Sequence, residues 1–173
     1  FRARPPGSES AALARVREAG ALAVADLSFL RSLGAASYVP VATYPNTVLG
    51  ISDGGAHCGL ICDASMPTYL LTHWVRDRAR GERIPLEQAV RLQTGNTARV
   101  YGFADRGTLE VGKKADLNVI DLDALHLHAP EMVFDLPASG RRLVQRVDGY
   151  RATIVAGTTT FEHGEATGAR PGK

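Results

Sequence analysis

The sequence predicts an α/β fold in which an α/β part is followed by a smaller β part. The run Thr47–Ser52, "TVLGIS", has the character of a buried strand and leads into a glycine-rich loop. Beyond that loop, apolar residues recur at helical spacing. After Gly102 this spacing disappears, and short β-type runs replace it. We therefore expect two parts, residues 1–102 and residues 103–173.

The first part opens with a Pro/Gly/Ser-rich segment, "FRARPPGSES", whose serines can cap a helix. That helix would run through "AALARVREAG" and end at Gly20. A second apolar segment covers Ala21–Leu33, and the strand Thr47–Ser52 follows it.

A further helix is expected after the glycine loop, because Ser65 and Pro67 suit a first helical turn and Gly81 suits the end. Its apolar positions are Tyr69, Leu70, Trp74, Val75 and Ala79. Another short helix is expected from Pro85. The residues predicted on one face of that helix are Leu86, Ala89 and Val90.

The second part is predicted to consist of short strands. The strand-like runs are Ala115–Asp121, Arg142–Val147 and Ala152–Gly157, followed by "TTTFEHGE". Gly157 suits the turn of a hairpin between the last two of these segments.

Composition excludes several classes of protein. The chain has 173 residues, 45% of them hydrophobic, which is enough for the core of one ordinary domain. The formal net charge is +2 and the basic residues are scattered, so we expect no nucleic-acid partner. No apolar run approaches the roughly 18 residues of a membrane span, so we expect a cytoplasmic protein with no membrane partner. Cys58 and Cys62 are expected to be reduced thiols.

The chain begins at Phe1 without an initiator methionine and ends in "ATGARPGK". We expect it to be a piece of a longer protein. An active site assembled from several strands would then be only partly represented in this sequence.

Asp53 is the candidate catalytic residue, because reactive groups in α/β folds gather where parallel strands end. Gly54 and Gly55 remove side chains that would block a substrate or a metal ion. A carboxylate placed there could ligate a divalent ion or carry a proton. The alternative is that Asp53 starts a tight turn, which spacing alone favours because Asp-Gly is a common turn dipeptide. His57 could contact substrate or simply bond to backbone.

Three segments carry a family resemblance: "GISDGGAH", "RGTLEVGKKADLNVID" and the closing "GYRATIVAGTTTFEHGEATGARPGK". Together they resemble the C-terminal portion of the amidohydrolase superfamily, in its N-acyl-D-amino-acid deacylase branch, also called the D-aminoacylase or amidohydrolase-3 group. The resemblance extends from about Pro45 to the end of the chain.

The resemblance implies the C-terminal part of a TIM-type (β/α)8 barrel, followed by the C-terminal portion of a small β-sandwich. In such enzymes one or two metal ions, usually zinc, activate a water that attacks an amide carbonyl. Asp53 would bind the metal or its water and pass a proton to the departing amine. Gly54, Gly55 and His57 would face a small-molecule amide substrate, most simply an N-acyl-D-amino acid.

The sequence departs from the family pattern in what it lacks. The family's histidine pair, its bridging ligand and its middle-strand histidines belong upstream of Phe1. With Asp53 as its one ligand the chain should hold zinc poorly, so we expect it to be inactive without the missing N-terminal half of the protein. The run His126–His128, "HLH", would place two imidazoles on one strand face, but we expect a surface turn there rather than a metal site.

Substrate identity is the least determined property. Related D-aminoacylases are understood to hold the substrate carboxylate with an arginine after the strand-8 aspartate, yet no Arg or Lys lies between Gly54 and Val75. Three alternatives stay open: a non-catalytic amidohydrolase-fold protein, a cyclic-amide hydrolase of the dihydroorotase or hydantoinase type, and a free-standing α/β binding module.

We expect most polar and aromatic residues between Cys62 and Arg80 to have structural roles. Cys62 and Asp63 could contact substrate, but we expect Asp63 to cap the next helix. His73 and Trp74 are expected to pack inside the protein. The arginines interleaved with Asp77 are expected to form a solvated helix face; they are Arg76, Arg78 and Arg80.

Overall fold

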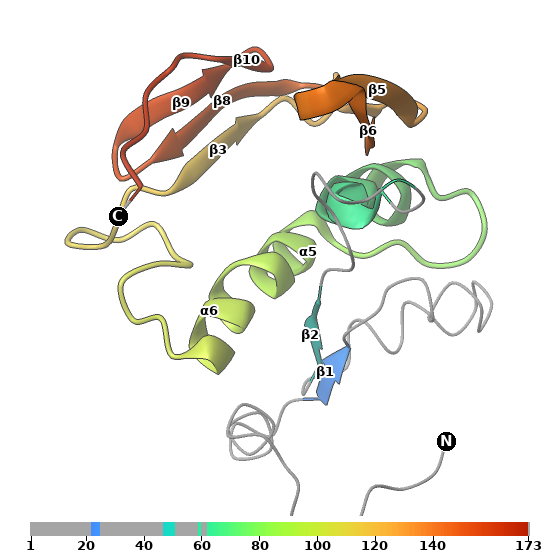
Figure 1. Ribbon diagram of the computed structural model, residues 1–173. Coiled ribbons are helices and arrows are strands. Elements are labelled where there is room, and N and C mark those ends of the chain that lie inside the picture. The colour runs from blue at the N-terminus through green and yellow to red at the C-terminus, as the bar shows by residue number, and fades with distance from the viewer. Residues whose placement is uncertain (1–21, 25–46, 51–58, 60–61, 173) are drawn as a thin grey trace, which may run out of the picture.

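The computed structural model describes residues 22–24, 47–50, 59 and 62–172. Its helices lie between a short parallel strand pair and the strands of the C-terminal part (Figure 1). The parallel pair joins β1 (Leu22–Val24) to β2 (Thr47–Leu49) in the register Leu22 to Thr47. Helices α5 and α6 pack against β2. Parallel pairing with helical packing is the arrangement expected of an α/β fold.

The predicted strand that starts at Thr47 is confirmed as far as Leu49. Thr47 and Val48 are both buried, although adjacent side chains on a strand point to opposite faces. Burial on both faces explains why this run is apolar without alternation. The predicted helix at "AALARVREAG" and most of the segment Ala21–Leu33 lie outside the described residues.

The helix predicted after the glycine loop is confirmed at its start. It consists of the 3-10 turn η1 (Asp63–Ser65), α4 (Met66–Tyr69) with proline in its first turn, and the π-helix η2 (Leu70–Asp77). The helix ends at Asp77 rather than near Gly81, because Arg78 adopts extended backbone with φ −60° and ψ 119°. The amide of Arg78 still donates to the carbonyl of His73, 2.8 Å away.

Two helices follow, α5 (Leu86–Gln93) and α6 (Gly95–Tyr101). The helix predicted from Pro85 is confirmed as α5. Its predicted face is confirmed at Ala89, which is buried, but is wrong at Leu86 and Val90, which are exposed. Leu92 is the other buried position, so the buried face follows the packing surface of the neighbouring elements rather than local hydrophobicity. The sequence did not separately predict α6, which ends at a left-handed Gly102.

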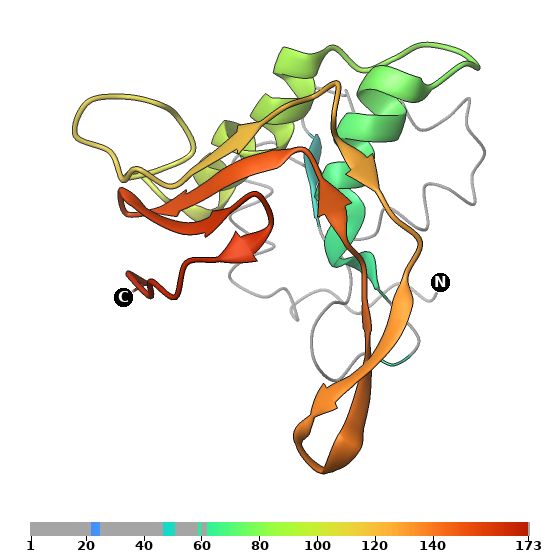
Figure 2. The same ribbon diagram turned by 90° about the horizontal axis from the view of Figure 1, so that it is seen from above.

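The C-terminal part consists of eight short strands and a 3-10 turn within the described residues. These elements are β3 (Leu117–Ile120), β4 (His126–Leu127), β5 (Glu131–Leu136), η3 (Pro137–Ser139), β6 (Gly140–Val144), β7 (Val147–Asp148), β8 (Tyr150–Val155), β9 (Thr158–Glu162) and β10 (Glu165–Ala166). Strands β10, β9, β8 and β3 form an antiparallel sheet in that order. The β5–β6 hairpin projects away from this sheet (Figure 2).

The predicted β-type runs are confirmed as β3, β6, β8 and β9. Gly157, with φ +78°, forms the predicted hairpin turn between β8 and β9. The sequence analysis did not identify β5. The predicted surface turn at His126–His128 is wrong, because His126 and Leu127 form β4 and pair with β7. A two-residue strand carries no periodicity of its own, so only its partner β7 defines it.

One core joins the helices to the β part. Its buried members are Leu70, Leu71, Trp74, Ile84, Ala89 and Leu125. Leu125 lies between β3 and β4, so the first turn of the β part is anchored among helical side chains. None of the helices in the described part of the chain has both the length and the hydrophobicity that a bilayer crossing requires.

Candidate functional site

The predicted site residues Asp53, Gly54, Gly55 and His57 lie outside the described residues. Their roles therefore stay predictions. The structure does describe the elements on either side of this loop: β2 and Gly50 before it, Gly59 next to its end, and the continuous chain from Cys62 onward.

Strand β2, which precedes the loop, is held in place by its neighbours. It is buried, it pairs in parallel with β1, and both α5 and α6 pack against it. Asp53 follows its last residue, Leu49, by four positions. The carboxyl end of a parallel strand is where α/β proteins carry their reactive groups.

The chain leaves the loop through η1 and α4. Cys62 is half-buried and Cys58 lies outside the described residues, so the predicted reduced state of the two thiols stays a prediction. The prediction that Asp63 caps the helix is wrong: Cys62 occupies the cap position, and Asp63 is the first residue of η1. Its carboxylate lies in the first turn, where negative charge is favoured by the helix dipole. The Ser65 hydroxyl donates to the carbonyl of Cys62 over 3.2 Å.

An aromatic cluster lies across the junction of α4 and η2. The rings of Tyr69 and His73 stack with centroids 5.1 Å apart, and Trp74 meets His73 edge-on at 4.9 Å. Trp74 is 6% exposed and belongs to the core, which confirms the prediction that it packs inside the protein. Single π-helical turns are frequent beside functional sites, so the widened helix is notable where it follows the predicted site loop.

The predicted solvated arginine face is wrong for two of its three members. The Arg78 guanidinium lies 4.5 Å from the Trp74 ring centroid, and the residue is only 5% exposed. Arg76 reaches the β part, where its Nη1 donates to the carbonyls of Leu122 at 2.5 Å and Leu125 at 2.9 Å. Arg80 is exposed, as predicted. The Arg76 contacts join residues 46 and 49 positions apart, so local sequence carried no signal for them.

Asp77 holds the Arg76 side chain in place. Arg76 donates from Nε to one Asp77 carboxylate oxygen at 2.6 Å and from Nη2 to the other at 2.8 Å. The hydrogen bond from Arg76 lowers the pKa of Asp77 below its ordinary value, and the same bond raises the pKa of Arg76. Both groups therefore stay charged over the ordinary pH range.

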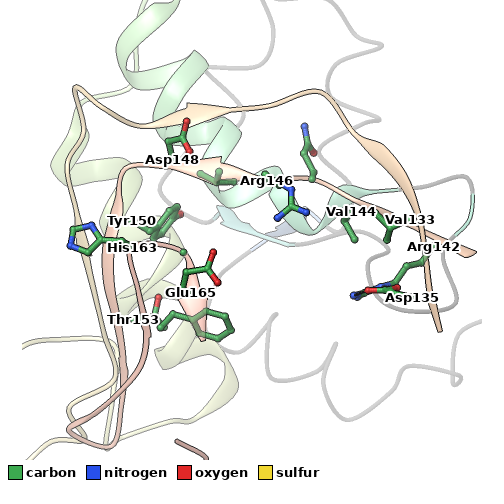
Figure 3. Close-up of a pocket in the computed structure, with 14 residues that line it drawn as sticks. Val133, Asp135, Arg142, Val144, Arg146, Asp148, Tyr150, Thr153, His163 and Glu165 are labelled. Atoms are coloured by element: carbon green, nitrogen blue, oxygen red, sulfur yellow. Dashed lines mark hydrogen bonds and ion pairs between the residues drawn. The ribbon is translucent and has the colours of Figure 1, made fainter. Parts of the chain in front are cut away.

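A hollow in the β part has a volume of about 670 Å³. Asp148 and His163 lie toward one end of it, and Asp135 and Arg142 toward the other (Figure 3). Arg142 and Asp135 form an ion pair at 2.6 Å, and the bond from Arg142 lowers the pKa of Asp135. The hollow is open and lined by paired charges, unlike the apolar, enclosed form typical of a small-molecule site.

The histidines of "HLH" lie on β4 and just after it. Their ring centroids are 4.7 Å apart. His128 Nε2 lies 2.7 Å from the Asp148 carboxylate. Within the described residues, no group of three or more His, Cys, Asp or Glu side chains is arranged to hold a metal ion.

Comparison with known proteins identifies the class and then the family. The described fold is α/β, and the profile of the amidohydrolase family matches residues 42–161. The chain therefore belongs to the amidohydrolase family. This confirms the resemblance drawn from the three sequence segments.

Similar proteins include hydrolases of linear and of cyclic amides. The chain is 34% identical over 104 residues to a D-aminoacylase of Alcaligenes xylosoxydans xylosoxydans, covering 60% of this chain and 19% of that protein. An N-acyl-D-glutamate deacylase of the same organism is 45% identical over 58 residues, 34% of this chain and 11% of that protein. An allantoinase of Rubrobacter xylanophilus is 34% identical over 97 residues, 54% of this chain and 21% of that protein.

Solved structures of D-aminoacylase match with a TM-score of 0.52 and 28% identity. The match covers 78% of this chain and 26% of D-aminoacylase. One of those structures addresses the functional role of the binuclear metal centre of D-aminoacylase. The chain thus spans about a fifth of the length of its curated relatives and a quarter of the D-aminoacylase chain.

Proposed function

We propose that this chain is the C-terminal part of a metal-dependent hydrolase that cleaves a linear amide, namely an N-acyl-D-amino acid. Residues 1–102 would complete a TIM-type barrel, and residues 103–173 would form part of a β-sandwich. Family membership, the two deacylase relatives and the D-aminoacylase structures support this assignment. The missing N-terminal half of the same protein would be its obligatory partner.

One observation carries the catalytic proposal. The buried parallel strand β2 ends at Leu49, and Asp53 comes four positions later in the sequence, in a glycine-rich segment. A carboxylate at such a strand end is held by the scaffold while its loop is open to a ligand. Asp53 would accept a proton from the attacking water and deliver it to the leaving amine nitrogen. Gly54, Gly55 and His57 would line the substrate side of the same loop.

The donor set of this chain fits a shared metal site only in part. Asp53 supplies a hard carboxylate oxygen, which suits a divalent ion, and zinc is the proposed metal. When bound, the ion would supply Lewis acidity toward water and the amide carbonyl. The described residues offer no ligand cluster, so the remaining ligands would come from the rest of the full-length protein.

The test is Asp53→Asn in the full-length protein, with Asp63→Asn as the matched control. We expect the Asp53 variant to retain most of its metal by elemental analysis. Its turnover of N-acetyl-D-amino acids should fall by roughly 10²–10⁴-fold, the usual contribution of a general acid–base group. Asp63→Asn should stay close to wild type. Unchanged amide hydrolysis in the Asp53 variant would remove this residue from the mechanism.

A second candidate function is cyclic-amide hydrolysis. The allantoinase relatives and an L-hydantoinase of Paenarthrobacter aurescens, 32% identical over 96 residues, favour it. So does the lack of Arg or Lys between Gly54 and Val75 to anchor a free carboxylate. A parallel screen of N-acetyl-D-amino acids, N-acetyl-L-amino acids, allantoin and hydantoins would separate the two. Activity on cyclic amides alone would replace the linear-amide assignment.

A further inference from the structure

Two histidines and an aspartate share one face of the β4–β7 strand pair. His126 pairs in register with Asp148, and His128 continues the same strand two residues later. Side chains two apart on a strand point to the same face. We refer to His126, His128 and Asp148 as the β4 cluster.

The backbone of the β4 cluster is held on both sides of His128. The amide of His128 donates to the carbonyl of Arg146 at 3.0 Å, which extends the ladder one residue beyond β4. The Gln145 side-chain amide donates to the carbonyl of His128 at 2.7 Å. Because the main chain is fixed at this point, the backbone positions from which the two imidazoles extend keep a defined separation.

That separation suits chelation. A metal–nitrogen bond of about 2.0–2.1 Å places an imidazole centroid roughly 3.2 Å from the ion, so two cis imidazoles have centroids about 4.5–5.2 Å apart. The rings of His126 and His128 are 4.7 Å apart and perpendicular. Rotation of the exposed His126 side chain, a motion of picoseconds to nanoseconds, would turn its nitrogen edge toward the same point.

Asp148 orients one of the two imidazoles. A carboxylate accepts hydrogen bonds, so in the 2.7 Å contact between them His128 Nε2 is the donor. This leaves Nδ1 of His128 as the nitrogen that can bind a metal. Metal-binding histidines commonly donate their other ring nitrogen to a carboxylate in this way, which makes the imidazole a better ligand.

The guanidinium of Arg146, just before the neighbouring strand β7, is paired with a carboxylate. Arg146 lies opposite His128 on the same strand pair, and its Nε donates to Glu131 at 2.7 Å. The ion pair draws the guanidinium toward β5. A cation at the β4 cluster would therefore be attracted by the Asp148 carboxylate. Its repulsion by Arg146 would be reduced, because Glu131 pairs with that guanidinium.

The geometry points to the β4 cluster as a binding site for one divalent transition-metal ion of the Cu²⁺, Ni²⁺ or Zn²⁺ class. His126 and His128 are its two ligands, water completes the coordination, and Asp148 is a positioning residue. No third ligand converges there among the described residues, so the affinity is that of a two-imidazole chelate. The order of affinity is Cu²⁺ above Ni²⁺ and Zn²⁺. The inference does not depend on the proposed role of Asp53.

The probe is Ni²⁺ alone, titrated into the 173-residue chain and followed by calorimetry and by the imidazole C–H signals in ¹H NMR. Paramagnetic Ni²⁺ should broaden the signals of His126 and His128 at substoichiometric amounts. The signal of His73, whose ring stacks on Tyr69 in the helical part, should persist. This readout on the wild-type chain needs no variant to fold.

Variants then assign the ligands. His126→Ala and His128→Ala should each weaken Ni²⁺ binding by at least about tenfold, and Asp148→Asn by about tenfold because it retains an acceptor. The matched control His163→Ala should leave the affinity unchanged, and far-UV circular dichroism should show native β content in every variant. Equal broadening of all histidine signals, or full affinity in His126→Ala, would overturn the site.

Discussion

Gly149 occupies a position that only glycine can fill. It connects β7 to β8 with φ +93°, which is a left-handed conformation. A Cβ atom there would lie 2.6 Å from Leu125 Cα and 2.7 Å from Leu125 N. Leu125 is 1% exposed and belongs to the core, so it cannot yield easily. The lack of a side chain at Gly149 therefore leaves room for Leu125, which packs among the helical residues of the core.

Gly149→Ala should destabilise the chain more than Gly112→Ala does. Gly112 has nearly the same φ, +91°, but open space around its Cβ position. The control variant should lose about 1 kcal/mol of unfolding free energy from the backbone alone. Gly149→Ala should lose on the order of 2 kcal/mol more from overpacking. Urea unfolding measures both, and equal losses would contradict the packing argument.

Helix η2 is the element that joins the two parts of the described chain. Its partner α4 contributes Thr68, whose hydroxyl lies 2.9 Å from that of Tyr150 on β8. Arg76 on η2 donates to carbonyls of the turn between β3 and β4. These bonds fix the β part against the helix that follows the predicted site loop. The helix therefore connects the β strands to the chain segment that begins at Cys62.

Arg76→Lys tests this connection, with Arg146→Lys as the matched control. Lysine keeps the charge but lacks the planar fork that reaches Asp77 and the turn carbonyls together. Loss of those charged hydrogen bonds should lower the unfolding free energy by about 1–3 kcal/mol. Arg146, whose side chain is 73% exposed, should tolerate the same change within about 0.5 kcal/mol. Equal urea midpoints for the two variants would show that the Arg76 bonds contribute nothing.

Paired carboxylates give the whole molecule an acid-sensitive stability. Hydrogen bonds from arginine lower the pKa of Asp77, Asp105, Asp121 and Asp135. At Asp121 the donors are Arg151 first and the amide of Ala124 second. A carboxyl group whose folded pKa lies below its unfolded pKa stabilises the fold above the unfolded value. That contribution disappears as the pH falls through the folded pKa.

The urea midpoint of the chain should therefore vary little between pH 7 and pH 5 and should decline as the pH falls below about 4. Asp121→Asn should reduce the size of this decline, because asparagine has no proton to gain. High salt should weaken the effect, since these pairs are exposed. A midpoint that stays constant down to pH 3 would contradict the assigned ion pairs.

Sequence patterns predicted the elements whose limits are set by residues within the element itself. The strand from Thr47, the helix start at Ser65 and the Gly157 hairpin are local features, set by apolar runs and turn residues. The boundary at Asp77 and part of the buried face of α5 were missed, because packing against other elements decides them. Strands β4 and β5 are too short or too polar on their own, so only their partners define them.

The amino-acid sequence by itself determined the family of this protein, because motifs such as "RGTLEVGKKADLNVID" are contiguous and need no fold to be recognised. It also marked Asp53 and its glycines as the candidate site. Only the tertiary structure decided that Arg76 reaches the β part, that Arg78 lies over Trp74, and that "HLH" forms a strand beside Asp148. The Arg76 and β4 contacts join residues distant along the chain, and the Arg78 contact forms where the helix has already ended, so the free energy that selects them exists only once the chain has folded.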